Sequence, residues 1–333
     1  MGLPMRTGRK IKLFGLSAMI LLTLGGCKVT GSEVVVNADH IDNKVFKIKE
    51  EVCTLPEARV VLTNYQNIYD TMYGIDLWDH GFKDNQLEKY VKDMTVSRLA
   101  QIMAMDYLAQ ENQVTLNEEE QAKVKEAAEA YFTSLNDAEK EYMQVKQGDI
   151  ETLYTRYGLA NKLYTFLTQG VNDEVSDEEA RVMEAEQIFV SDDEKAKEVE
   201  QQIKEGNDFL TVANRYNEAA EIEVFFSKNN LEQKVADAVF SLENDEVSKK
   251  IKTDDGYYFV KCINHYDQER TDDNKSVILE ERRKEAFDDV YQGFLTDLPS
   301  EFNEELWDEV KVELSKDVTT DSFFQVYEKY CTW

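Results

Sequence analysis

The stretch Ile251-Lys252-Thr253-Asp254-Asp255-Gly256-Tyr257-Tyr258-Phe259-Val260-Lys261 does most to decide the fold. Apolar and aromatic residues stand on both sides of a polar Asp-Gly pair, a pattern that is typical of two strands joined by a tight turn. The sequence therefore predicts strands at residues 247–251 and 257–263, with the turn at Asp255-Gly256.

The residues before this turn predict a small unit of mixed structure. Strands are expected at 186–190 and 222–226, and helices at 191–205, 208–216 and 231–242. Polar residues that are typical of helix N-caps precede the first two helices, and Gly206-Asn207 separates them. The element order between residues 184 and 264 is therefore β-α-α-β-α-β-β.

The flanks of this unit are predominantly helical. Apolar residues with a helical period predict helices at 54–73, 86–111, 117–135, 137–147 and 149–169, after short strands that include Val34–Val36 and Val45–Ile48. Thr54-Leu55-Pro56-Glu57 is a capping box at the first helix start. A charged loop is expected at His265–Lys275, then a helix at 276–298 and a tail that contains Phe323–Tyr327.

Both flanks carry apolar stripes that need a partner, so residues 27–183 and 265–333 are expected to form one helical domain interrupted by the insert 184–264. The stripes are rich in Met and Tyr. They are either an ordinary core or a groove that holds unfolded chains, because Met and aromatic surfaces adapt to many sequences.

Composition excludes several classes of protein. The chain has 333 residues with a net charge of −29, a charge that repels nucleic acids. Only 14 Gly and 3 Pro speak against all-β and Gly-rich nucleotide-binding folds. His40, His80 and His265 lie far apart and no Cys-x-x-Cys occurs, so no metal site is expected, and no cofactor.

Residues 1–26 have the pattern of an export signal. Arg6, Arg9, Lys10 and Lys12 precede the apolar run 13–24. Leu24-Gly25-Gly26-Cys27 resembles the bacterial lipobox, which implies cleavage before Cys27, lipid attachment to its thiol and a place on the extracytoplasmic face of the bacterial membrane. The alternative is an uncleaved anchor helix. With Cys27 lipidated, Cys53, Cys262 and Cys331 are left, and an odd number leaves one thiol unpaired in a monomer.

Residues 184–264 resemble a parvulin-type peptidyl-prolyl isomerase domain. The pieces that carry the resemblance are Glu186–Val190, Ala196–Phe209, Ala238–Ser248 and Ile251–Lys261, in the family's order and with similar gaps. The resemblance implies a catalyst of rotation about X–Pro bonds, which seats proline in an apolar pocket and binds the twisted amide better than the planar one.

The whole layout is similar to the extracytoplasmic foldase lipoproteins of the PrsA and SurA type. This resemblance implies an α+β chain, in which a mostly helical, discontinuous SurA-like chaperone domain carries an inserted parvulin-like domain. It implies unfolded or newly secreted proteins as clients and allows a homodimer. Three functions stay open: a holdase with a degenerate parvulin domain, an active isomerase, and a solute-binding lipoprotein.

The expected proline pocket departs from the parvulin pattern. Gln187 and Tyr258 stand at the two histidine positions, where they form either a hydrogen-bonded polar pair or part of the core. Ala219 replaces the acidic or thiol residue, and Val235 replaces the pocket Phe. Candidate pocket residues in agreement with the family are Phe226, Leu231 and Thr253. These departures predict weak or absent catalysis.

The lipobox gives a direct prediction. Replacing Cys27 by Ala is expected to remove the acyl attachment and shift the protein from the membrane fraction to the soluble fraction, because acyl chains supply the anchoring. Fractionation and mass spectrometry of the wild type and of a Cys53→Ala control measure this shift. An unmodified Cys27 in the membrane-bound wild type would contradict it.

Overall fold

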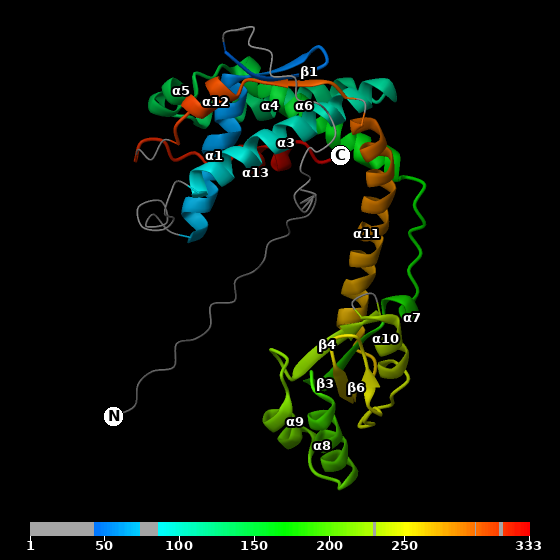
Figure 1. Cartoon of the computed structure of the whole chain (residues 1–333). Coiled ribbons are helices and arrows are strands. Elements are labelled where there is room, and N and C mark those ends of the chain that lie inside the picture. The colour runs from blue at the N-terminus through cyan, green and yellow to red at the C-terminus, as the bar shows by residue number, and fades with distance from the viewer. Residues whose placement is uncertain (1–42, 74–85, 229–230, 297, 313–315) are drawn as a thin grey trace, which may run out of the picture.

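The computed structural model describes residues 43–73, 86–228, 231–296, 298–312 and 316–333. Figure 1 shows a group of helices at one end and a small mixed unit at the other, with one long helix between them. The predicted signal segment, Cys27 and the strand expected at Val34–Val36 lie outside the described residues. In the described part of the chain, no helix is long and apolar enough to cross a membrane.

The helical unit contains both flanks of the chain. Its first part comprises α1 (Leu55–Tyr73), α3 (Gln86–Glu111), α4 (Glu118–Ser134), α5 (Asp137–Met143) and α6 (Gln147–Thr168). Its second part comprises the end of α11 (Gln268–Leu295), α12 (Glu304–Glu309) and α13 (Phe323–Tyr330). The two parts share one apolar core, which includes Leu62, Ile102, Tyr154, Phe287 and Phe323.

A three-stranded sheet also joins the two parts. It consists of β1 (Lys44–Ile48), β2 (Glu51–Thr54) and β7 (Ser300–Phe302) in the order β2-β1-β7, with antiparallel pairing. The strand expected at 45–48 is confirmed. Its pairing with β7 was not predicted, because only tertiary structure brings residues 46 and 302 opposite each other.

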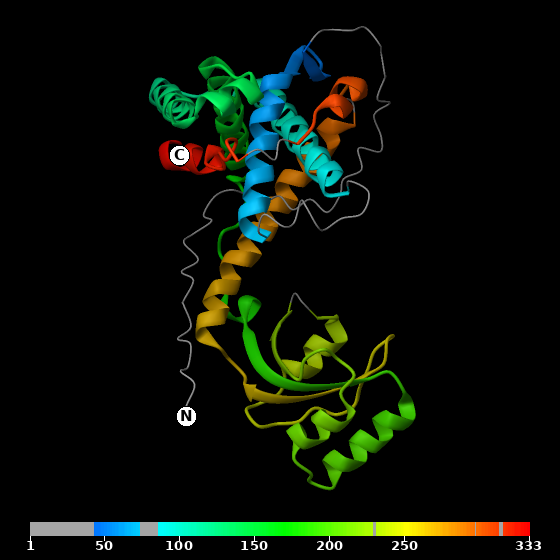
Figure 2. The ribbon, with the colours of Figure 1, turned by 90° about the vertical axis from the view of Figure 1, so that its left-hand side faces the viewer.

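The second unit has the predicted order of strands and helices. It contains β3 (Val182–Val190), α8 (Asp193–Lys204), α9 (Phe209–Tyr216), β4 (Glu223–Ser227), α10 (Gln233–Val239), β5 (Ile251–Lys252) and β6 (Tyr257–Asn264). The strands form one antiparallel sheet, β4-β3-β6-β5. Short α7 (Asp177–Ala180) precedes it, and Figure 2 shows α11 leading back from it to the helical unit.

Capping residues fix the helix starts as predicted. The Thr54 backbone N–H donates to Glu57 Oε2 at 2.7 Å, and the Glu57 N–H donates to Thr54 Oγ1 at 3.4 Å. Asn117 forms the same reciprocal box with Glu120 at α4. The Met- and Tyr-rich stripes are mostly core, since Leu99, Ile102, Met103 and their neighbours are buried, whereas Tyr90 is 54% exposed.

Two local predictions were wrong. From Gln268 on, the loop expected at 265–275 is instead the first part of α11. Asp267 caps this helix by accepting from the Arg270 N–H, and Thr271 is buried against β3, where its hydroxyl accepts from the Val182 N–H. The strand expected at 247–251 reduces to a single bridge at Val247 and to β5, which begins at Ile251.

The two units have separate cores. The core of the helical unit contains residues between 45 and 164 and between 287 and 331. The small unit has two apolar clusters, whose residues all lie between 183 and 262. We therefore propose the discontinuous helical domain with an insert, on boundaries close to 184 and 264. The strand β3 begins two residues before the first boundary, and Met183 on it is fully buried.

Asn64 links three segments of the helical core. Its fully buried amide nitrogen donates to the Tyr131 hydroxyl at 2.6 Å and to the Val60 carbonyl at 2.8 Å. Its amide oxygen accepts from the Phe323 N–H at 3.0 Å. One side chain of α1 thus satisfies buried polar groups on α4 and at the start of α13.

Replacing Asn64 by Ala is expected to lower the free energy of unfolding of the helical unit by about 2–4 kcal/mol, because buried polar partners lose their bonds and a cavity forms. Denaturant unfolding measures the loss. Asn112→Ala is the matched control in the same unit, since its amide also donates four residues back, to the Leu108 carbonyl at 2.8 Å, and shows no tertiary hydrogen bond among the described residues. Equal losses in both variants would contradict the proposed linking role of Asn64.

Gly256 occupies the turn between β5 and β6. Its φ is +155°, and a Cβ there would lie 2.5 Å from the Val190 carbonyl oxygen and 2.8 Å from the Phe189 ring. The close approach of the turn to β3 therefore requires a residue without a side chain.

Replacing Gly256 by Ala is expected to destabilise the small unit by about 2–5 kcal/mol, through backbone strain and overlap with β3. Gly206→Ala separates the two causes, because Gly206 has φ +84° but nothing within 4 Å of the added Cβ. That control should lose only about 1–2 kcal/mol. Thermal unfolding followed by circular dichroism compares them, and a Gly256 variant as stable as the Gly206 variant would show that the close approach carries no cost.

Candidate functional site

The candidate site lies on one face of the four-stranded sheet. Alternation along β3 places Met183 and Ala185 on the side of α10, and Ile188 and Val190 on the side of α8 and α9. Four of the six pocket residues predicted from the sequence share the α10 side. Phe226 and Val235 are buried in that cluster, and partly buried Leu231 and Tyr258 pack against it.

Tyr258 lies in the apolar part of this face. It stands opposite Phe189 in the β3–β6 register, and the two ring centroids are 4.8 Å apart at an angle of 43°. Burial, with the negative charges of Asp255 and Glu232, raises the pKa of Tyr258. The phenol therefore stays protonated near neutral pH and is a donor, not a base.

Gln187 holds a loop in place. Its side-chain Nε2 donates to the Glu221 carbonyl at 3.0 Å, while its backbone N–H donates to the Ile222 carbonyl at 2.8 Å. Although both residues are described, no hydrogen bond joins the Gln187 side chain to that of Tyr258. The bond considered between these two residues is therefore replaced by a bond from β3 to the segment 217–222.

Asn217 completes the anchoring of this loop. Its Oδ1 accepts from the N–H groups of Phe189 and Ala219, and its Nδ2 donates to the carbonyls of Ala219 and Glu221. Ala219 contributes no polar side chain at the position of the family's acidic or thiol residue. Sequence reasoning missed the roles of Asn217 and Phe189; the Asn that directly follows the helix 209–216 was the available signal.

Thr253 serves the turn before β6. Its N–H donates to the Gly256 carbonyl at 2.9 Å, and its hydroxyl donates to the same oxygen at 3.2 Å. The hydroxyl is half-buried and already has an acceptor. Of the six predicted pocket residues, the structure thus brings four into an apolar cluster, while Gln187 and Thr253 bond to backbone carbonyls.

The cluster is mostly buried core, and the partly exposed Leu231 and Tyr258 offer apolar contact rather than acid–base chemistry. It contains aliphatic and aromatic side chains, the thiol of buried Cys262 and the Tyr258 phenol. Burial also raises the pKa of Cys262, so its thiol stays protonated. Among the described residues, no three His, Cys, Asp or Glu side chains gather into a metal site.

Sequence comparison shows which known protein family and which proteins this chain resembles. Residues 169–274 match the family described as PPIC-type PPIase domain. The foldase protein PrsA of Caldanaerobacter subterraneus is 24% identical over 288 residues, which cover 76% of this chain and 82% of that protein. PrsA 1 of Bacillus cereus is 26% identical over 122 residues, 35% of this chain and 42% of that protein.

Solved structures give similar neighbours. The crystal structure of PrsA from Bacillus cereus aligns with a TM-score of 0.38 and 20% identity, over 74% of this chain and 95% of that one. A SurA-like chaperone of Campylobacter jejuni aligns with a TM-score of 0.29 and 9% identity, over 79% of this chain and all of that one. By sequence, residues 169–274 match the PPIC-type peptidyl-prolyl isomerase family, and the chain is similar to the PrsA-type foldases, as its motifs predicted.

Proposed function

We propose that this chain is an extracytoplasmic foldase that holds unfolded or newly secreted proteins and has weak or no isomerase activity. The observation that carries the proposal is the match of residues 169–274 to the PPIC-type domain, inserted between two parts of one helical core. The similarity to proteins named foldase PrsA supports the same general role.

Weak catalysis is proposed because the polar side chains of the candidate site already have hydrogen-bond partners within the protein. The barrier to rotation about a peptide bond is about 18–20 kcal/mol, and a catalyst lowers it by binding the twisted amide more tightly than the planar one. Such binding needs donors that are free to meet the amide. The side chains of Gln187 and Thr253 instead bond to the Glu221 and Gly256 carbonyls.

The apolar part of the site favours the second candidate, an active isomerase. Phe226, Leu231 and Val235 belong to one apolar cluster with Tyr258, and Leu231 and Tyr258 stay partly exposed, where they can contact a proline ring. A solute-binding lipoprotein is less favoured, because such a protein is expected to have two α/β lobes, whereas this chain has one small α+β unit and one helical unit.

The place of action is part of the proposal. Lipid attachment at Cys27 would hold the chain on the outer face of the cell membrane, where secreted clients emerge unfolded. A net charge of −29 keeps the body soluble and favours neutral or basic clients over acidic ones. A homodimer is compatible with this role.

The proposal is tested by two assays on the same preparation. In a protease-coupled assay with a proline peptide, the catalytic efficiency is expected to stay well below ~10⁴ M⁻¹s⁻¹, the lower end for enzymes. In an aggregation assay, the chain is expected to keep an unfolded protein soluble at equimolar concentration. The Gly256→Ala variant, which perturbs the small unit, separates the contributions of the two units to each activity.

An efficiency at or above that limit would favour the active isomerase. Gln187→Ala, Thr253→Ala and Tyr258→Phe would then identify the groups that contribute. Failure in both assays would contradict the foldase role itself.

A further inference from the structure

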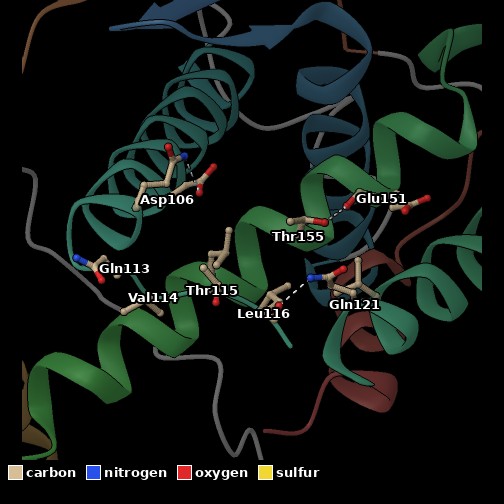
Figure 3. Close-up of a pocket in the computed structure, with 11 residues that line it drawn as sticks. Asp106, Gln113, Val114, Thr115, Leu116, Gln121, Glu151 and Thr155 are labelled. Atoms are coloured by element: carbon tan, nitrogen blue, oxygen red, sulfur yellow. Dashed lines mark hydrogen bonds between the residues drawn. The ribbon is translucent and has the colours of Figure 1, made fainter. Parts of the chain in front are cut away.

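A pocket in the helical unit lies far from the candidate proline site. The end of α3, the segment 112–117, the start of α4 and the first half of α6 surround it, as Figure 3 shows. Its volume is about 630 Å³, within the ~300–1,000 Å³ that is typical of ligand sites. The pocket is therefore large enough to take a side chain and part of its backbone.

The pocket combines apolar walls with negative charge. Val114, Leu116 and Leu159 contribute apolar surface, and Asp106 and Glu151 contribute carboxylates. Figure 3 shows Asp106 on α3 and Glu151 on α6 on different sides of the pocket. The described residues that line it include amides and hydroxyls but no Lys, Arg or His.

The charged groups around Arg156 leave this negative charge in excess. Arg156 donates to Glu57 at 2.8 Å and to Glu51 at 3.1 Å, whereas its Nε is 3.9 Å from Asp106 Oδ2. Three carboxylates thus surround one guanidinium, and the two shorter contacts belong to the glutamates. Asp106, which is 6% exposed, keeps a 3.4 Å hydrogen bond from Gln110 and a long ion pair.

Burial of a carboxylate without a close cation is costly. Desolvation raises the pKa of Asp106, and the pKa of Glu57 is raised for the same reason. A cation entering from the pocket would supply the missing partner. Arginine suits the site best, since its guanidinium is weakly hydrated and its long aliphatic part can lie along Val114 and Leu159.

We propose that this pocket binds an arginine side chain of an unfolded client, with the guanidinium attracted by the negative charges of Asp106 and Glu151 and the aliphatic part on the apolar wall. This inference rests on the proposed foldase function and names one chemical class of client segment. The charge of the whole chain has the same sign as the pocket, so it attracts basic segments before contact.

The test uses the purified full chain and two fluorescent peptides. The first has one arginine flanked by leucine and alanine, and the second has citrulline in its place, which keeps the shape and removes the charge. Fluorescence anisotropy is expected to show about tenfold tighter binding of the arginine peptide, the value of one charged hydrogen bond.

Glu151→Gln tests the site without touching the buried Arg156 cluster. This variant is expected to lose most of the preference for arginine, while thermal unfolding stays unchanged. Glu129→Gln is the matched control, because it removes one exposed carboxylate of α4 outside the pocket lining. It should keep the tenfold preference.

Equal affinity for the two peptides would overturn the inference, and so would an equal loss in the Glu129 and Glu151 variants, which would indicate attraction to overall charge. An aggregation assay on the same samples separates this failure from failure of the foldase role. Suppression of aggregation without a preference for arginine rejects only the pocket, whereas absence of suppression rejects the proposed function.

Discussion

Phe323 makes ring contacts and backbone hydrogen bonds with several segments of the helical core. Its ring centroid lies 4.6 Å from that of Tyr154 and 5.3 Å from that of Tyr131. Its N–H donates to Asn64, and its carbonyl accepts from the Tyr154 hydroxyl. Asn64 and Phe323 are 259 positions apart, so the entropy of closing this long loop must be offset by the contacts that the closure forms. Because the chain must return to α1, the ends of the insert have to lie together. The Asp267 N–H donates to the Val182 carbonyl at 2.9 Å and thereby joins the entry and exit of the small unit.

The connection between the units is mostly polar, beside the buried Ala180 of α7 and Ile278 of α11. Arg282 donates to the carbonyls of Asn172 and Glu174, and Lys275 pairs with Asp177 at 2.6 Å. No apolar cluster of the described residues combines members of both units. Exposed ion pairs contribute about 0–1 kcal/mol each, so these contacts orient the insert without merging its stability with that of the helical core. Movement of one unit relative to the other is the physical expectation for such a junction.

Sequence reasoning succeeded where the determinants are local. The capping box of Thr54 and Glu57 located the start of α1, and the order of elements in the insert followed from alternation and turns. It failed where distant residues decide. The early start of α11 depends on burial of Thr271 against β3, and the partner of β1 is β7. For the candidate site, the sequence predicted which apolar residues share a face. It did not predict that the Gln187 amide bonds to Glu221, because that contact depends on the path of the loop 217–222.

Because the side chains of Gln187 and Thr253 bond to backbone carbonyls, the candidate site can bind a client proline more readily than it can catalyse rotation about its peptide bond. Each donor already bonds to a backbone carbonyl, and transferring it to a client amide would break that bond at a cost of about 0.5–1.5 kcal/mol, while the carbonyl keeps its second donor, the Asn217 amide or the Thr253 N–H. The apolar face bears no such cost, since contact with a proline ring requires no protein bond to break. A client could therefore contact this face and the acidic pocket of the helical unit at once, each weakly. Two weak contacts on one chain raise the effective concentration of the second site once the first is occupied, yet each releases quickly. A protein that must hold and then free an unfolded chain needs this combination more than it needs one tight site.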